Sequence, residues 1–230
     1  SIGSTLLVLS FNGSLYVTDE EAPLRKFTEI DELFITCMDA WRSSKGGVEG
    51  VIAGTSRGVV YFLSRTGEMQ RRVEDAHRGP VAAVSISRDF QSVLTAGDDG
   101  KTKLYSRNGM LRNEISVGEE NLVTSIAWSL DANLIALGGL GGLWICPTMT
   151  RSSKNIRLSE NSLSFLSSNS ENDLLLMGDE NGAVTLLNFK SQIFFCYNNN
   201  GKNYFSGCIL PFDSRAIIMA SDEVALGFGV

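Results

Sequence analysis

Residues 96–112 read AGDDGKTKLYSRNGMLR, two glycine-containing turns on either side of one short segment. The segment 101–105 alternates polar and apolar positions, and a period of two is typical of a β-strand. Glycine accepts a positive φ without a steric penalty, so Gly100 and Gly109 suit tight turns. The stretch therefore predicts a β-hairpin that runs directly into a further turn and strand.

This pattern recurs along the chain. Its turn positions are Gly13, Gly58, Gly100, Gly142 and Gly182, followed by a degenerate copy at Asp222. Successive turns are separated by 40 to 45 residues. A repeat of this length is typical of the WD40 class, in which each repeat supplies four strands to one blade of a propeller.

The segments around each hairpin supply the other two strands of a blade. Apolar inner strands are expected at 34–41, 81–87, 122–129 and 162–168, and more polar outer strands at 69–75 and 110–117. No extended 3.6-residue apolar period predicts a helix. We therefore expect an all-β, WD40-type β-propeller with about five to six blades of four antiparallel strands. Residues 1–230 then form one propeller domain or a fragment of one, and the closure of the ring stays open.

Composition narrows the possible functions. The chain has 230 residues, is 43% hydrophobic and carries a net charge of -6. An acidic balance argues against nonspecific nucleic-acid binding, which needs a basic face. The longest apolar runs are far shorter than the roughly 20 residues of a membrane helix, so we expect a soluble protein without membrane insertion.

Residues that could hold a cofactor are sparse. The four cysteines form no CxxC pair and are interpreted as small apolar residues, and a single histidine makes a zinc site improbable. The glycine-rich segment 138–142 lacks the Lys-Ser/Thr of a phosphate-binding loop. We expect no cofactor, no metal and no small-molecule substrate.

The third repeat most closely resembles the WD40 pattern. That resemblance implies a hydrogen-bonded chain through His77, Thr95, Asp99 and Tyr105, because these residues stand at the positions that form it in WD40 proteins. The other repeats contain no histidine and are expected to rely on packing. Near the position of Tyr105 they carry Val17, Leu63, Trp144 and Leu187.

A closer resemblance lies in residues 58–115. Their motifs VEDAHRGPV (73–81) and GMLR (109–112), continued by VTSIAW (123–128), are similar to the N-terminal propeller of the 80-kDa intraflagellar transport subunits. The resemblance covers most of residues 6–147. It implies a non-catalytic scaffold of the intraflagellar transport B train that binds other train subunits. It also implies a location in the cytoplasm and the cilium or flagellum, including the basal body.

Two alternatives stay open. One is a WD40 scaffold of another assembly, such as a vesicle coat. The other is a propeller-fold enzyme such as a glycosidase, which needs two carboxylates across a cleft. The acidic residues here fall mostly in turns and outer segments, which favours a scaffold and no enzymatic activity. Arg78 and Arg88, in loops between strands, are the candidate partner-binding residues.

Overall fold

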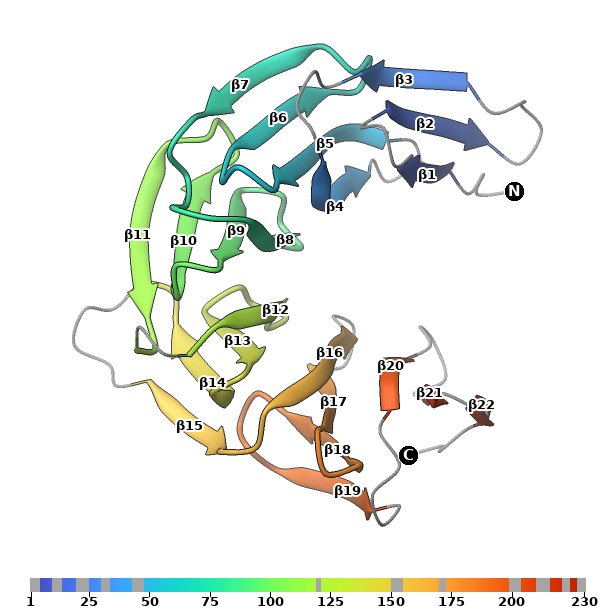
Figure 1. The fold of residues 1–230 in the computed structure, drawn as a ribbon, viewed down its shortest axis with the longest axis vertical. Helices are drawn as coiled ribbons and strands as arrows, with labels where there is room; N and C mark the ends of the chain where they lie inside the picture. The colour runs from blue at the N-terminus through green and yellow to red at the C-terminus, as the bar shows by residue number, and fades with distance from the viewer. Residues whose placement is uncertain are drawn as a thin grey trace.

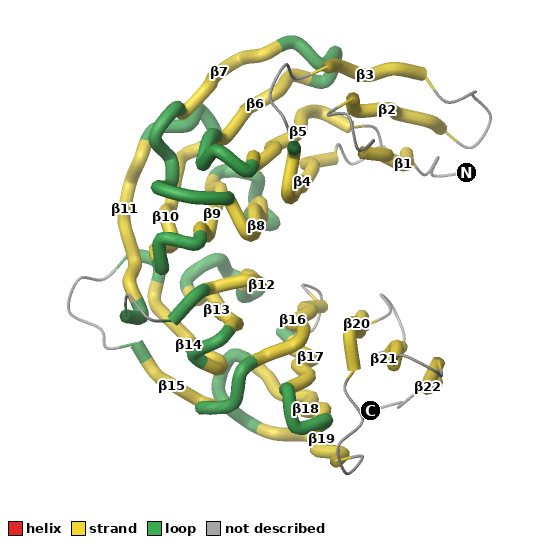
Figure 2. Tube along the Cα trace, viewed as in Figure 1, coloured by secondary structure: helices red, strands yellow, loops and turns green. Residues whose placement is uncertain are grey.

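The structure is a computed structural model. It describes residues 5–9, 14–19, 25–29, 34–42, 48–118, 121–149, 155–169, 173–198, 204–209, 216–220 and 224–226. Within these ranges every regular element is a β-strand, and Figure 2 shows strands and loops without a helix. The prediction of an all-β fold is confirmed.

The described strands form six antiparallel sheets, each built from strands that follow one another in the chain. Blade 1 holds β1 (Thr5–Leu9), β2 (Ser14–Asp19) and β3 (Arg25–Glu29). Blade 2 holds β4 (Ile35–Arg42), β5 (Val48–Thr55), β6 (Val60–Ser64) and β7 (Met69–Val73). Blade 3 holds β8 (Val81–Ile86), β9 (Ser92–Gly97), β10 (Lys101–Ser106) and β11 (Leu111–Ser116).

The second half of the chain continues the series. Blade 4 holds β12 (Val123–Trp128), β13 (Leu134–Gly139), β14 (Gly142–Pro147) and β15 (Ile156–Ser159). Blade 5 holds β16 (Leu163–Asn169), β17 (Leu174–Asp179), β18 (Ala183–Asn188) and β19 (Ile193–Asn198). Blade 6 holds β20 (Tyr204–Ile209), β21 (Ala216–Ala220) and β22 (Val224–Leu226).

The blades fan around one axis in an arc (Figure 1). The first strands β4, β8, β12 and β16 line the inside, and the last strands β7, β11, β15 and β19 follow the outer rim. Blades 1 and 6 stand at the two ends of the arc, and their described strands do not pair with each other. This is the predicted propeller of five to six blades, with described strands that form an open arc.

The expected strands lie where the sequence predicts them. The four expected inner strands correspond to β4, β8, β12 and β16 within one or two residues. The described hairpin glycines all have positive φ, namely Gly58 (+79°), Gly100 (+72°), Gly142 (+93°) and Gly182 (+79°). Gly13 and Asp222 lie outside the described residues.

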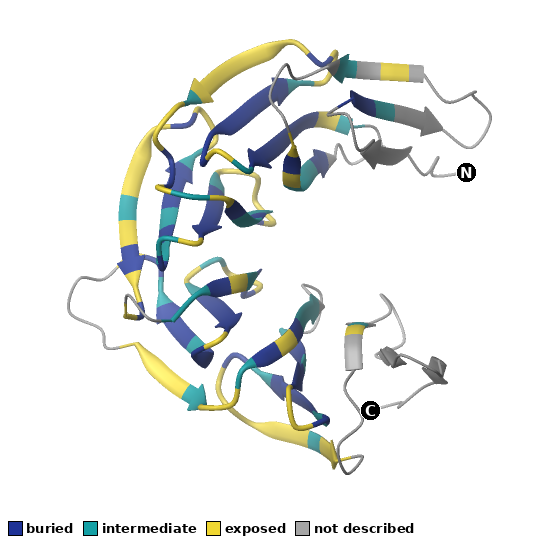
Figure 3. Ribbon diagram, in the orientation of Figure 1, coloured by how far each residue is buried: buried dark blue, intermediate teal, exposed yellow. Residues whose placement is uncertain are grey.

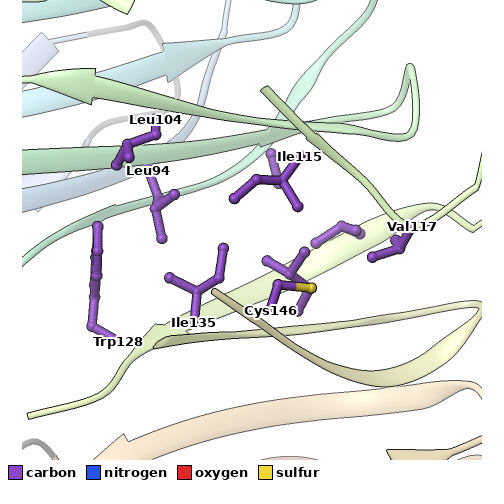
Figure 4. Close-up of a cluster of buried hydrophobic side chains, with 10 residues drawn as sticks. Leu94, Leu104, Ile115, Val117, Trp128, Ile135 and Cys146 are labelled. Atoms are coloured by element: carbon purple, nitrogen blue, oxygen red, sulfur yellow. The ribbon is translucent and has the colours of Figure 1, made fainter. Parts of the chain in front are cut away.

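Apolar side chains fill the space between neighbouring blades. Leu94 and Leu104 of blade 3 meet Trp128 and Ile135 of blade 4 in one buried cluster (Figure 4). Burial of each such side chain contributes about 1.5 to 3 kcal/mol. In Figure 3 the middle strands are buried and the outer strands are exposed, and β7 reads Met-Gln-Arg-Arg-Val with four exposed positions. Strand β7 thus presents mainly polar residues to solvent, as an edge strand requires, whereas β19 exposes Ile193 and Phe194.

Each sheet is a simple meander, so its loops alternate between the two ends of the blade. We define the upper face by the loops between blades and the hairpin turns of Gly58 and Gly100. The lower face carries the turns between the first and second strands and between the third and fourth strands of each blade. In blade 3 these lower turns are residues 87–91 and 107–110.

Replacing Gly58 tests how closely the loop between blades 2 and 3 is fitted. A Cβ at Gly58 would lie 2.0 Å from the His77 carbonyl oxygen, in addition to the strain of φ +79°. We expect Gly58→Ala to destabilise the protein by about 3 kcal/mol, measured by urea denaturation. Gly79→Ala is the matched control, because a Cβ there meets only Asp98 at 3.5 Å. Equal effects of the two substitutions would contradict the fit.

Candidate functional site

His77 stands where the chain enters blade 3 at the upper face. Its backbone N–H donates to the Gly58 carbonyl at 3.0 Å, and its side chain is buried. The ring Nδ1 lies 2.9 Å from Asp99 Oδ1, and Nε2 lies 2.8 Å from Thr95 Oγ1. These contacts, which we call the blade 3 clamp (His77, Thr95 and Asp99), tie the entering loop to strand β9 and to the β9–β10 turn.

The imidazole rests directly on the backbone of Gly97. A Cβ at this position would lie 2.4 Å from His77 Cγ and 2.5 Å from Nδ1. Any side chain at Gly97 would therefore displace the ring from Thr95 and Asp99. The glycine before the turn is needed for this close approach, since its φ is not positive.

Asp99 fixes the turn through both carboxylate oxygens. Oδ2 accepts the Arg78 N–H at 3.1 Å, and Oδ1 accepts the Lys101 N–H at 3.2 Å. Burial acts to raise the pKa of Asp99, but the hydrogen bonds from His77, Arg78 and Lys101 outweigh it and hold that pKa below its usual value. Asp99 is therefore a carboxylate at neutral pH.

The clamp histidine is neutral. Burial lowers the pKa of His77, and the neighbouring Asp99 carboxylate offsets this only in part. A neutral imidazole has one donor and one acceptor nitrogen. Both contacts are satisfied when Nδ1–H donates to Asp99 and Nε2 accepts the Thr95 hydroxyl. The His77 side chain has no exposed surface, so a substrate in solvent does not reach either ring nitrogen.

Tyr105 lies apart from these three residues. Its ring packs edge-on against Phe62 of blade 2, with centroids 6.4 Å apart at 71°, inside the apolar cluster between blades 2 and 3. Burial, with the Glu114 and Asp99 charges, raises the pKa of Tyr105 to about 12. In the described part of the chain no hydrogen bond joins the Tyr105 hydroxyl to the clamp. The structure thus brings together three of the four residues.

The strand register corrects the position of Trp144. Tyr105 pairs with Val93 in blade 3, and the equivalent pair in blade 4 is Cys146 with Ile135. Cys146, not Trp144, therefore occupies the position of Tyr105, because the β13–β14 turn is one residue shorter than the β9–β10 turn. Trp144 lies two residues earlier, under the Arg157 guanidinium at 5.3 Å.

Blade 5 has a polar clamp of its own, so the expectation that the repeats without histidine rely on packing alone is wrong there. Asn161 Nδ2 donates to Asp179 Oδ2 at 2.8 Å, and Asp179 Oδ1 accepts the N–H groups of Asn181 and Ala183. By register Asp179 corresponds to Gly97 rather than to Asp99. The signal in the sequence is the run GDENG (178–182), in which Asp179 precedes the turn glycine Gly182 by three residues.

The two candidate partner-binding residues lie on opposite faces. Arg78 is exposed at the upper face and lines a hollow of about 440 Å³ with Gly79, Asp98, Asp99 and Lys101. Arg88 is exposed in the lower turn of blade 3 and borders a second hollow of about 310 Å³. Since strand β8 separates them, the structure does not combine the two arginines into one site.

The described residues contain neither a metal centre nor a membrane-spanning helix. Among them, no group of three or more His, Cys, Asp or Glu side chains is placed to hold a metal ion. They also contain no helix long and apolar enough to cross a membrane. Burial raises the pKa of the Cys37 thiol to about 11 and that of Cys146 to about 12, so both remain protonated at neutral pH.

Comparison with known proteins supports both the fold and the resemblance. Intraflagellar transport protein 80 homolog of Mus musculus is 31% identical over 87 residues, 38% of this chain and 11% of that protein. The homolog of Rattus norvegicus is 31% identical over 88 residues, with the same shares of the two chains. These alignments are shorter than the stretch 6–147, and the chain matches only about a tenth of either relative. No protein-family model matches the chain.

Two solved structures share the architecture, and one of them is a WD40 domain. The C-terminal WD40 domain of Sif2 has a TM-score of 0.75 and 16% identity, covering 94% of this chain and 63% of that one. Sqt1 of Saccharomyces cerevisiae has a TM-score of 0.81 and 16% identity, covering 98% and 68%. The chain therefore has the WD40-type propeller fold.

Removing the clamp imidazole should weaken blade 3. We expect His77→Ala to destabilise the protein by about 1 to 3 kcal/mol, because Thr95 and Asp99 lose their buried partner. Thr95→Val removes only the Nε2 contact and should cost less. Chemical denaturation of the three proteins checks this order, and an unchanged free energy of unfolding in His77→Ala would contradict a stabilising clamp.

The clamp also predicts a pH dependence. The pKa of His77 is lowered from 6.5 in the folded state, so only the unfolded chain gains this proton as the pH falls below about 6.5. Stability is therefore fully present above that pH and decreases below it. Because His77 is the single histidine of the chain, the difference between wild type and His77→Ala should shrink between about pH 7.5 and 5. Urea denaturation at several pH values measures this, and a constant difference would refute a neutral buried imidazole.

Proposed function

We propose that this chain is part of a non-catalytic WD40 scaffold subunit of the intraflagellar transport B train. The observation that carries the proposal is the 31% identity with the intraflagellar transport protein 80 homologs over 87 residues. Its partners are then other train subunits. It acts in the cytoplasm and in the cilium or flagellum, including the basal body, without a cofactor or a nucleic acid.

The use of the described carboxylates supports a scaffold rather than a hydrolase. Asp99 and Asp179 hold upper turns through backbone N–H groups. Asp131 holds a lower turn in the same way, and the Asn133 N–H and the Ser129 hydroxyl keep its pKa below the usual value. A glycosidase needs one carboxyl with a raised pKa. These three groups instead maintain the loops that present the propeller surface.

Co-purification from ciliated cells tests the proposal. A tagged version of the full protein that contains this chain should recover train subunits, detected by mass spectrometry, and should localise to cilia and basal bodies. A second version carries Gly58→Ala, which is expected to disturb the loop into blade 3 and therefore to lower the recovery of partners. Recovery of vesicle-coat subunits without train subunits would favour the alternative assembly.

Activity assays address the enzymatic alternative. We expect the purified chain to leave a panel of aryl glycosides intact. Hydrolysis that a single carboxylate substitution abolishes would overturn the scaffold proposal, because it would identify that carboxylate as catalytic.

A further inference from the structure

Four arginines gather at the lower face where blades 2 and 3 meet. Arg107 and Arg112 flank the tip of the β10–β11 turn, Arg88 lies in the β8–β9 turn, and Arg71 lies on the outer strand β7. All four side chains are exposed. We call them the arginine cluster.

Two of the arginines bridge the blades. A Cβ at Gly109 would lie 2.5 Å from Arg71 Cδ, so the Arg71 side chain of blade 2 runs against the lower turn of blade 3. In the opposite direction, the Arg107 guanidinium lies 5.3 Å from the ring centroid of Trp41 in blade 2. The Arg71 stem packs along the turn and the Arg107 guanidinium lies over the Trp41 ring, so both side chains are held at the boundary between the two blades.

Arg88 and Arg112 belong to the same surface. The Arg107 N–H donates to the Gln91 carbonyl at 3.0 Å, which joins the β10–β11 turn to the β8–β9 turn that carries Arg88. Arg112 Nη1 donates to Ser92 Oγ at 3.2 Å, at the end of that turn. The cluster is therefore one connected surface rather than four separate side chains.

The local charge opposes that of the chain. Residues 87–92 and 106–112 contain three arginines and one acidic residue, Asp89, in a chain of net charge -6. One oxygen of Asp89 already accepts the Ser87 hydroxyl and the Gln91 N–H. Asp39 borders the same hollow as Arg88 and supplies a second carboxylate there, so the positive excess of this surface rests on Arg71, Arg107 and Arg112.

Exposed apolar side chains lie among the arginines. Met110 and Leu111 are 63% and 55% exposed, and Phe90 is 37% exposed. Phe90 and Arg88 also border the 310 Å³ hollow, together with Trp128 of blade 4. A surface that mixes guanidinium groups with exposed apolar side chains suits a partner that offers carboxylates and apolar side chains together.

We propose that the arginine cluster binds an acidic protein segment with interspersed apolar residues. This rests on the proposed scaffold function and assigns one docking surface to it, on the face opposite the clamp. A protein segment fits better than a nucleic acid, because the basic area is confined to two blades and is interrupted by Met110, Leu111 and Phe90.

Peptide binding tests the surface directly. The probe is a fluorescein-labelled peptide of roughly 12 residues in which Glu and Asp alternate with Leu and Phe. Its binding to the chain is measured by fluorescence anisotropy. We expect binding at about 0.15 M ionic strength that weakens as salt increases. Arg88→Glu with Arg112→Glu should weaken it about tenfold. Arg57→Glu with Arg78→Glu, at exposed positions of the upper face, makes the same charge change and should leave affinity almost unchanged.

Each outcome of these binding measurements either supports or overturns the proposal. Equal losses in the two double variants, or no binding by the wild-type chain, would overturn the proposal, as would tighter binding to a DNA duplex of about 20 base pairs than to the peptide. Should Arg88→Glu with Arg112→Glu unfold the chain, Arg88→Gln with Arg112→Gln must still weaken binding. If the peptide does not bind but train subunits still co-purify, this inference fails and the scaffold function stands.

Discussion

Each four-stranded sheet of this protein, blades 2 to 5, has two apolar faces, and the neighbouring sheets cover them. Leu94 and Leu104 of blade 3 face Trp128 and Ile135 of blade 4, while Tyr105 faces Phe62 of blade 2. Because the free energy of burial depends on adjacent blades, the repeats must follow one another around the axis. The arc and the exposed outer strands are consequences of that constraint, and so are the loops collected at two faces.

Packing between sheets does not fix the loops that connect them. In blade 3 the entering loop is held by His77, which reaches both strand β9 and Asp99. In blade 5 Asn161 and Asp179 perform the same task with different residues at different register positions. A buried turn needs its polar groups satisfied, and more than one arrangement of side chains can do so.

The strands and their packing could be predicted from the sequence, whereas the side chains that hold the loops could not. The strands followed from a period of two and from recurrent glycines, and the described hairpin glycines all adopt positive φ. The register did not follow, since a turn shorter by one residue moved Trp144 away from the position of Tyr105. The Asn161–Asp179 pair was missed because it matches neither the residue types nor the spacing of the blade 3 clamp. The arginine cluster was not visible either, because its members come from three separate segments.

The two faces of blade 3 consequently present different chemistry. At the upper face His77 and the Asp99 carboxylate are directed inward, where they satisfy the loop and strand of their own blade. At the lower face the turns are held by the hydroxyls of Ser87 and Ser106, with the Asp89 carboxylate in the β8–β9 turn. Arg88 and Arg107 lie beside these turns and are exposed. The exposed charge of the lower turns is thus mainly guanidinium, whereas the upper turns of this blade carry both carboxylates and basic groups. The chemistry of the turns, rather than that of the strands, therefore distinguishes the two faces available to a partner.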